Sequence, residues 1–240
     1  MRVRLRFSKQ GKVRFTSHRD TARMWERALR RLSLPVAYSE GFSPRPKLHF
    51  GLALSTGYES VSEFLDVDLL PVDLLAIDEL PERLTPVLPT GIDVTAAVEV
   101  PAGTPSLQQA VTVCAWHIEI TGPTPAELLA ATDRALAADE LLTTRERKGK
   151  PVTDDLRPYF RSLMVGEPTA SGVSLVAELG TQPRSLRPSE LISALDPSFV
   201  EGRVCRTHQW IEHDGARREP LDEARPSVAT SAPHAEARAS

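Results

Sequence analysis

The order strand, helix, strand, strand, helix, strand can be read twice along this chain, and it limits the possible folds more than any other feature. The first reading spans residues 1–102 and the second spans residues 108–213. Strands are predicted where apolar and polar residues alternate, and helices where apolar residues recur three and four positions apart. The β-α-β-β-α-β order is typical of the ferredoxin-like fold. We therefore expect an α+β protein of two tandem ferredoxin-like units.

Local patterns give the expected bounds of each element. In the first unit we expect strands at 2–7, 48–54, 63–69 and 92–100, a helix between Ser17 as N-cap and Pro35, and a helix at 71–84 that Pro81 shortens or kinks. In the second unit we expect strands at 111–121, 142–147 continuing through 159–165, 173–179 and 203–212, with helices at 125–138 and 187–195.

Two segments are expected to lie outside these units. Proline and glycine between residues 101 and 106 indicate a linker, which we place at 103–107. Residues 214–240 are expected to form a disordered tail, because most of this segment is rich in alanine, arginine, glutamate, proline and serine.

Positive charge is concentrated at the start of the chain. The net charge is -3, but residues 1–50 hold 13 lysines and arginines against three acids, whereas residues 51–100 hold ten acids against Arg83 alone. This division predicts one face for a polyanion and another for solvent or a basic partner. The alternative is that the two stretches neutralise each other across a sheet.

The cysteine content and the hydropathy exclude several classes of protein. Cys114 and Cys205 lie far apart, so this chain alone cannot form a zinc ribbon or a cysteine-ligated iron–sulfur cluster, and we expect no metal and no cofactor. No stretch approaches the roughly 20 apolar residues of a membrane span. The basic N-terminus also lacks the apolar run of a secretion signal. We therefore expect a cytoplasmic protein without a membrane partner.

The first helix is expected to bury one face and to carry arginines on the other. At 100° per residue its arginines fall within about 80° of each other, opposite the apolar residues. The apolar face consists of Trp25, Ala28, Leu29 and Leu32, and the arginine stripe consists of Arg19, Arg23, Arg27 and Arg30.

The segment YSEGFSPRPKLHFG, residues 38–51, is an unusually cationic loop. Gly41 can adopt backbone angles that other residues avoid, and two prolines stiffen the chain around Arg45. An arginine that is already ordered loses little entropy when it binds an anion, so Arg45 and Lys47 are expected to bind phosphate. Phe42 would either stack on a base or anchor the loop in the core. The alternative for the whole loop is a stiff crossover with solvated cations.

Three residues in this region are candidates for catalysis. His18 begins the first helix, and Tyr38 and His49 lie in the cationic loop. Together they could form a metal-independent acid–base set that cleaves RNA at a 2′-hydroxyl. The alternative for His18 is a capping or surface histidine. The sequence contains no phosphate-binding glycine signature, HExxH motif or serine nucleophile elbow, so catalysis by this chain alone is not expected.

A second cationic segment, RERKGKPVTDDLRPYF, covers residues 145–160. It is expected to form a basic hairpin arm in which Lys148, Lys150 and Arg157 follow a nucleic-acid backbone. The alternative is a solvated hairpin tip. Asp155 and Arg157 could also form a buried pair that orients the loop.

Five motifs together resemble those of a known family. They are FTSHRD at 15–20, PVAYSEGFSPRPKLHFGLALSTGYES at 35–60, SEFLDVDL at 62–69, KGKPVTDDLRPYF at 148–160 and RVCRTHQWI at 203–211. Over residues 1–212 the chain resembles the radical-SAM-linked bacterial family of unknown function, as a stand-alone member without the radical SAM domain. The resemblance implies a role beside RNA processing or modification, and it assigns no catalytic residue.

These features predict an RNA-binding accessory protein that positions a structured RNA for a radical SAM protein, encoded separately, or for a ribonuclease. Contacts are expected mainly to phosphate, without a preference for DNA, because the aromatic motifs of RNA-binding sheets are missing. The alternatives are a metal-independent RNA endonuclease and a protein adaptor without RNA contact. The expected contact residues are Arg19, Arg23, Arg45, Lys47, Lys148, Lys150 and Arg157.

Overall fold

The computed structural model describes residues 1–71, 75–147 and 149–224 of the 240-residue chain. The strands are β1 (Arg2–Lys9), β2 (Leu48–Phe50), β3 (Glu59–Asp68), β4 (Val94–Val100), β5 (Val113–Thr121), β6 (Leu142–Arg147), β7 (Lys150–Asp155), β8 (Phe160–Thr169), β9 (Gly172–Gly180), β10 (Val200–His213) and β11 (Ala216–Arg218). The α-helices are α1 (His18–Arg31), α2 (Leu80–Leu84), α3 (Leu107–Ala110), α4 (Pro125–Ala137), α5 (Pro188–Leu195) and α6 (Pro220–Ala224). Short 3-10 helices are η1 (Gly11–Phe15), η2 (Ile77–Glu79), η3 (Thr85–Val87) and η4 (Arg157–Tyr159).

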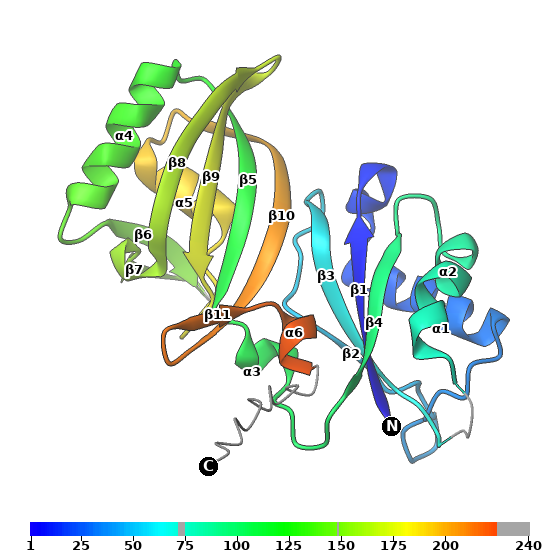
Figure 1. Cartoon of the computed structure of the whole chain (residues 1–240). Helices are drawn as coiled ribbons and strands as arrows, with labels where there is room; N and C mark the ends of the chain where they lie inside the picture. Colours follow the sequence, from blue (N-terminus) through cyan, green and yellow to red (C-terminus); the bar gives the residue numbers. More distant parts are fainter. Residues whose placement is uncertain (72–74, 148, 225–240) are drawn as a thin grey trace, which may run out of the picture.

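One mixed sheet of nine strands runs through both halves of the molecule (Figure 1). Its order is β4-β1-β3-β10-β5-β9-β8, with β2 beside β3 and β11 beside β10. The halves meet where β3 and β10 pair in parallel, through Glu59 with Cys205 and Ser60 with Arg206. The expected mixture of helices and strands is therefore confirmed. Among the described residues, no helix is both long and apolar enough to span a lipid bilayer.

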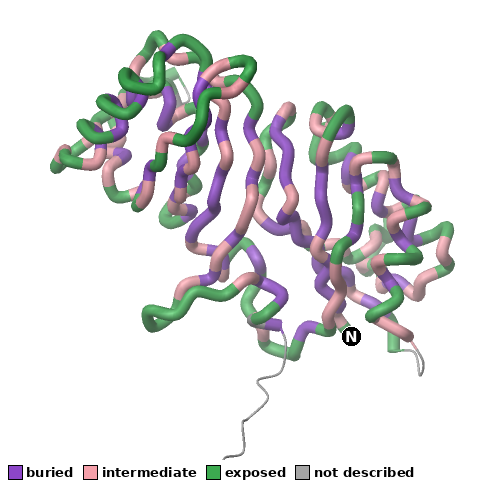
Figure 2. The backbone as a smooth tube through the Cα atoms, turned by 45° about the horizontal axis from the view of Figure 1, so that its top comes forward, coloured by how far each residue is buried: buried purple, intermediate pink, exposed green. Residues whose placement is uncertain are grey.

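The helix α1 forms as its sequence predicts. The Ser17 side chain caps it by accepting a hydrogen bond from the Asp20 backbone N–H at 3.1 Å. Its apolar face packs on the sheet, where the rings of Trp25 and Phe7 meet edge to face at 5.0 Å. Figure 2 shows this arrangement as buried strands in the middle and exposed outer helix surfaces.

The basic face of β1 is neutralised inside the protein. Arg4 is 0% exposed and binds Asp66 of β3 through two hydrogen bonds of 2.7 and 2.9 Å. Arg2 pairs with Asp68, the residue directly opposite it in the antiparallel register. Neutralisation across the sheet therefore holds for Arg2 and Arg4, because cross-strand partners on one face lie within contact distance, whereas Arg6 pairs with Glu219.

The second half buries the inner faces of α4 and α5 against β5, β8 and β9. A Thr124 capping box begins α4, with Glu127 as the reciprocal partner. One expectation is wrong here: residues 142–147 do not continue into the strand at 159–165. Instead β6 and β7 form a separate two-stranded hairpin, and β8 begins only after η4.

Two expected elements of the first half are much shorter than predicted. Of the helix expected at 71–84, residues 72–74 lie outside the described residues, and the α-helix covers only Leu80–Leu84 with Pro81 in its first turn. The strand expected at 48–54 ends at Phe50. Gly51 then approaches the backbone of Phe64, and the chain leaves the sheet.

The expected linker and the start of the expected tail are ordered. Leu107 in α3 and Leu221 in α6 are buried together against Phe64. The backbone carbonyl of Pro220 accepts a hydrogen bond from Arg4 at 3.0 Å, so α6 covers the buried ion pair of β1. The disorder expected from residue 214 is therefore wrong for residues 214–224, because apolar burial holds them, and residues 225–240 lie outside the described residues.

Candidate functional site

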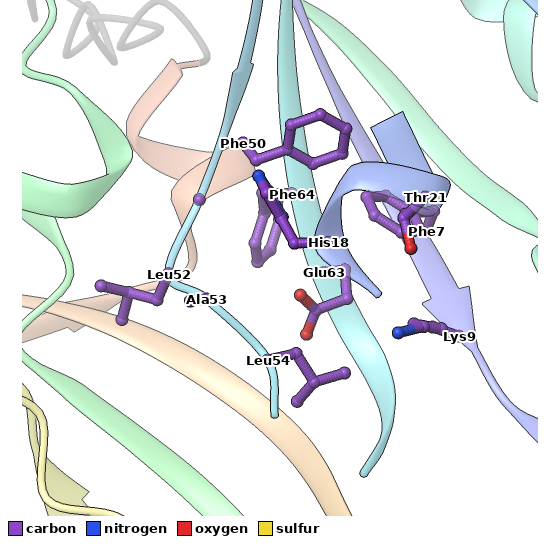
Figure 3. A pocket seen from close by; sticks show the side chains of 11 residues that line it. Phe7, Lys9, His18, Thr21, Phe50, Leu52, Ala53, Leu54, Glu63 and Phe64 are labelled. Carbon is purple, nitrogen blue, oxygen red and sulfur yellow. The ribbon is translucent and has the colours of Figure 1, made fainter. Parts of the chain in front are cut away.

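Three hollows meet at the junction of the two halves, and His18 and Ala53 line all of them. The largest, with a volume of about 810 Å³, is lined by residues from both halves and is called the cleft below. The second has a volume of about 410 Å³ and also contains His49. The third, of about 30 Å³, is shown in Figure 3. The position of His18 follows from the cap at Ser17, which starts α1 at this point.

The cleft combines an apolar floor with a cationic rim. Its volume lies within the range of about 300–1,000 Å³ that is usual for ligand sites. The floor consists of Leu52, Leu54, Tyr58, Trp116, Leu179 and Leu186. The basic side chains on the rim are His18, Arg145, Arg184 and Arg187, and the acids Glu146 and Glu190 also line the cleft.

A network of charges orders part of this rim. Asp154 accepts hydrogen bonds from Arg145 at 2.7 Å and from Arg184 at 3.1 Å, and Arg184 also binds Glu190 at 3.0 Å. The hydrogen bond from Arg145 holds the pKa of the Asp154 carboxyl below its usual value. The hairpin β6–β7 is thus attached to the start of α5 by side chains that are only partly exposed.

A buried ion pair supports the cleft from below. Arg206 of β10 binds both carboxylate oxygens of Glu63 of β3, at 2.6 and 2.7 Å, and also the carbonyl of Leu52 at 2.9 Å. Its guanidinium lies over the ring of Trp116, 5.3 Å from the centroid. The pair therefore fixes the position of Leu52 in the cleft floor.

Lys9 and Glu63 point into the smallest hollow from neighbouring strands (Figure 3). Lys9 is 5% exposed, and its ammonium donates a hydrogen bond to the Thr16 carbonyl at 3.1 Å. Burial lowers the pKa of Lys9, although the nearby Glu63 carboxylate opposes this shift. His18 borders the same hollow, with its ring edge-on to Phe50 at 4.9 Å.

The three catalytic candidates do not all converge. His18 and His49 line the same 410 Å³ hollow. The Nε2 atom of His49 lies 3.1 Å from an Asp68 carboxylate oxygen. Tyr38 lies elsewhere, in a hollow beside Arg30 of α1. The structure therefore brings two of the three residues together.

The arginine stripe of α1 remains free of acidic partners for most of its length. Among the described residues, no carboxylate lies within ion-pair distance of Arg19, Arg27 or Arg30, and Arg23 has only a 3.7 Å contact with Asp20. This contrasts with β1, whose arginines are all paired with acids.

The loop around Arg45 is a small hairpin that lies beside the end of α1. The backbone N–H of Ser39 donates to the Arg45 carbonyl at 2.9 Å, and the Arg45 N–H donates to the Ser39 hydroxyl at 3.0 Å. Phe42 at the tip is fully exposed, so it does not anchor the loop in the core. Lys47 lines a different hollow, with Arg2 and others. The hollows described here therefore do not bring the stripe, Arg45 and Lys47 together.

The side chain of Arg157 is bound within the protein itself. Its guanidinium donates hydrogen bonds to the carbonyls of Leu136, Ala138 and Phe160, at 3.0, 3.1 and 3.3 Å. Two of these carbonyls are at the C-terminal end of α4, where helical carbonyls lack partners within the helix. The expected Asp155–Arg157 side-chain pair is not formed: Asp155 accepts from the Arg157 backbone N–H instead. Lys150 is exposed near the hairpin tip, and Lys148 lies outside the described residues.

Sequence reasoning missed Lys9, Arg184 and Arg187 as residues of this region. No local motif marks them, because they come from segments far apart in the chain. Among the described residues, no group of three or more histidine, cysteine, aspartate or glutamate side chains is placed to hold a metal ion.

Two comparisons with known proteins complete the description. A search of curated proteins found no match. The sequence of residues 2–188, which is most of the chain, matches the family DUF2344, described as an uncharacterized protein conserved in bacteria. The matched region includes α1, the loop around Arg45 and the hairpin β6–β7. The protein therefore belongs to the DUF2344 family of conserved bacterial proteins.

Proposed function

We propose that this protein binds structured RNA and presents it to a partner enzyme, either a radical SAM protein or a ribonuclease. The proposed contact surface is called the cationic surface, and it consists of Arg19, Arg23, Arg27, Arg30, Arg45 and Lys47. Lys150 is retained as a peripheral contact. Arg157 is left out, because its guanidinium already binds three carbonyls.

One observation carries the proposal: most cations of the first 50 residues fall into two groups, apart from Lys9 and Lys12. The arginines of β1 and Arg14 are paired with acids, and one of them is fully buried. The cations of α1 and of the loop are exposed, and among the described residues only Arg23 has an acidic partner. Exposed, unpaired cations in a protein with a net charge of -3 favour an external polyanion as their partner.

The hairpin around Arg45 adds to this argument. Hydrogen bonds between Ser39 and Arg45 order the backbone before any ligand binds, which reduces the entropy lost on binding. The exposed ring of Phe42 could stack on an unpaired base, as aromatic side chains do in many RNA complexes.

The proposal is tested by crosslinking and sequencing the RNA bound in cells. The double variant Arg45→Ala/Lys47→Ala should recover much less RNA than the wild type. Arg134→Ala, an exposed arginine of α4 far along the chain, serves as the matched control and should recover as much as the wild type. Equal recovery from the double variant would contradict the proposed surface.

A second candidate function is RNA cleavage by His18 and His49, which line one hollow. One imidazole would take the proton of a 2′-hydroxyl, whose oxygen attacks phosphorus to form a 2′,3′-cyclic phosphate. The other imidazole would donate a proton to the departing 5′-oxygen. Purified protein should then cut structured RNA in EDTA, and both His18→Ala and His49→Ala should abolish the cut. Intact RNA after incubation with the wild type would exclude this function.

We also infer that each half is a ferredoxin-like unit and that the protein works with a radical SAM partner. The strand orders β4-β1-β3-β2 and β10-β5-β9-β8, each with antiparallel neighbours, support the first inference. The second rests on the motif resemblance.

If the protein is only an adaptor, a radical SAM protein should co-purify after nuclease treatment, and Arg45→Ala should disrupt that association instead of RNA binding.

A further inference from the structure

The basic side chains on the rim of the cleft come from three distant parts of the chain. His18 is the first residue of α1, Arg145 belongs to β6, and Arg187 immediately precedes α5. The folded protein brings all three to one hollow of about 810 Å³. The rim also contains Arg184, but its terminal nitrogens are bound to Asp154 and Glu190.

We infer that the cleft is a binding site for a single nucleotide, with its phosphate held at the rim and its base on the floor. The nucleotide is either free or an unpaired residue of an RNA chain, since both present the same groups. The site is separate from the cationic surface and shares none of its six residues. The inference rests on the proposed function only if the nucleotide is an unpaired residue of an RNA chain.

Arg145 is the residue best prepared to hold a phosphate. Its Nε atom donates to Asp154 at 2.7 Å and lies 3.9 Å from Glu190, which restrains the orientation of the guanidinium. Among the described residues, neither terminal nitrogen of Arg145 has a hydrogen-bond acceptor. A planar pair of free N–H groups in a fixed orientation matches the geometry of a phosphate group.

Arg187 and His18 extend the same cationic rim. Both are exposed, and neither forms an ion pair within the described residues. They can therefore approach an anion without first breaking a contact with a carboxylate. Arg184 differs from these two side chains because it is already paired with Asp154 and Glu190.

The floor and one acid of the rim favour a nucleotide over a simple phosphate. Leucine side chains, Tyr58 and Trp116 line the cleft and provide an apolar surface for a flat ring. Glu146 also lines the cleft, is exposed, and has no ion pair among the described residues. Its carboxylate can accept a hydrogen bond from the amino group of a base.

Isothermal titration calorimetry tests this inference directly on the full chain. The ligands are the four nucleoside 5′-monophosphates, the matching nucleosides and inorganic phosphate. At least one monophosphate should bind, while its nucleoside and inorganic phosphate should each bind roughly tenfold more weakly or worse. Arg145→Ala and Arg187→Ala should each weaken binding by a similar factor. Arg145→Lys, which keeps the charge but loses the planar fork, should also weaken it.

Arg134→Ala is the control and should bind as the wild type does. The Arg187 side chain forms no ion pair within the described residues, so its variant keeps the test valid even if Arg145→Ala fails to fold. Failure of all four monophosphates to bind would overturn the inference. Unchanged affinity in both alanine variants would overturn it as well.

Competition experiments identify the source of the nucleotide. If a single-stranded oligonucleotide displaces the bound monophosphate and a duplex does not, the cleft takes an unpaired residue of RNA. If neither displaces it, the cleft takes a free nucleotide. Loss of RNA binding in Arg45→Ala/Lys47→Ala would report on the proposed function alone, because these residues lie outside the cleft.

Discussion

Arg206 of β10 and Glu63 of β3 form a buried ion pair across the junction between the two halves, with a shortest N–O distance of 2.6 Å. Arg206 is only 1% exposed. The same guanidinium binds the carbonyl of Leu52 and lies over the ring of Trp116, so it connects the sheet with two residues of the cleft floor.

We expect Arg206→Ala to lower the free energy of unfolding by about 3–5 kcal/mol, because it leaves the Glu63 carboxylate buried without a partner. Urea denaturation measures this change. Arg161→Ala, which removes an arginine from an exposed pair with Glu212, should cost about 1 kcal/mol or less. Similar losses in the two variants would show that the junction pair has no special role.

The segment after β10 should contribute measurably to stability. A chain that ends at residue 213 loses Leu221, which packs on Phe64, and the Pro220 carbonyl that binds Arg4. We expect its free energy of unfolding to fall by at least about 2 kcal/mol. A chain that ends at residue 224 keeps these contacts, and it should unfold at a higher urea concentration than the chain that ends at residue 213. Equal midpoints for all three chains would contradict the packing of α6.

Lys9 should make stability depend on alkaline pH. Burial lowers its pKa in the folded state, while the unfolded residue titrates near the ordinary value of 10.5. Between these two pKa values the unfolded chain binds more protons, so the free energy of unfolding rises with pH. Urea melts should show this rise for the wild type and not for Lys9→Met. Lys12→Met, at an exposed lysine, should behave as the wild type, and parallel curves for the wild type and Lys9→Met would refute the prediction.

Arg157 should matter for stability and not for RNA binding. Arg157→Ala removes hydrogen bonds to the carbonyls of Leu136, Ala138 and Phe160, so we expect a loss of about 1–3 kcal/mol in the free energy of unfolding. Arg157→Lys keeps the charge but not the fork, and it should also destabilise. Stable variants that bind RNA more weakly would instead place Arg157 in the RNA contact.

The local elements of this fold could be predicted well from the sequence. The apolar face of α1 and its Ser17 cap are short-range features, and both are confirmed. The alternation of apolar and polar residues at 2–7 correctly predicted a strand, which the structure has as β1. It could not show that Asp66 lies opposite Arg4, because strand register depends on contacts between residues 62 positions apart.

The site could be predicted only in part, for the same reason. The candidates His18 and His49 lie in α1 and β2, which follow one another along the chain, and both line one hollow. The cleft, however, combines α1, the segment after β2, the hairpin β6–β7 and the start of α5. Its rim depends on the pairing of Arg145 with Asp154 and of Arg184 with Glu190, and no periodicity within a single element can indicate such pairs.

The salt dependence of RNA binding tests the central proposal most directly. For a protein that binds through phosphate contacts, the logarithm of the affinity falls linearly with the logarithm of the salt concentration, with a slope of about 0.7–0.9 per contact. We predict that Arg45→Ala/Lys47→Ala binds a structured RNA more weakly and has a slope smaller by roughly 1.4–1.8 than the wild type, while Arg134→Ala keeps the wild-type slope. A double variant with the affinity and slope of the wild type would contradict the account.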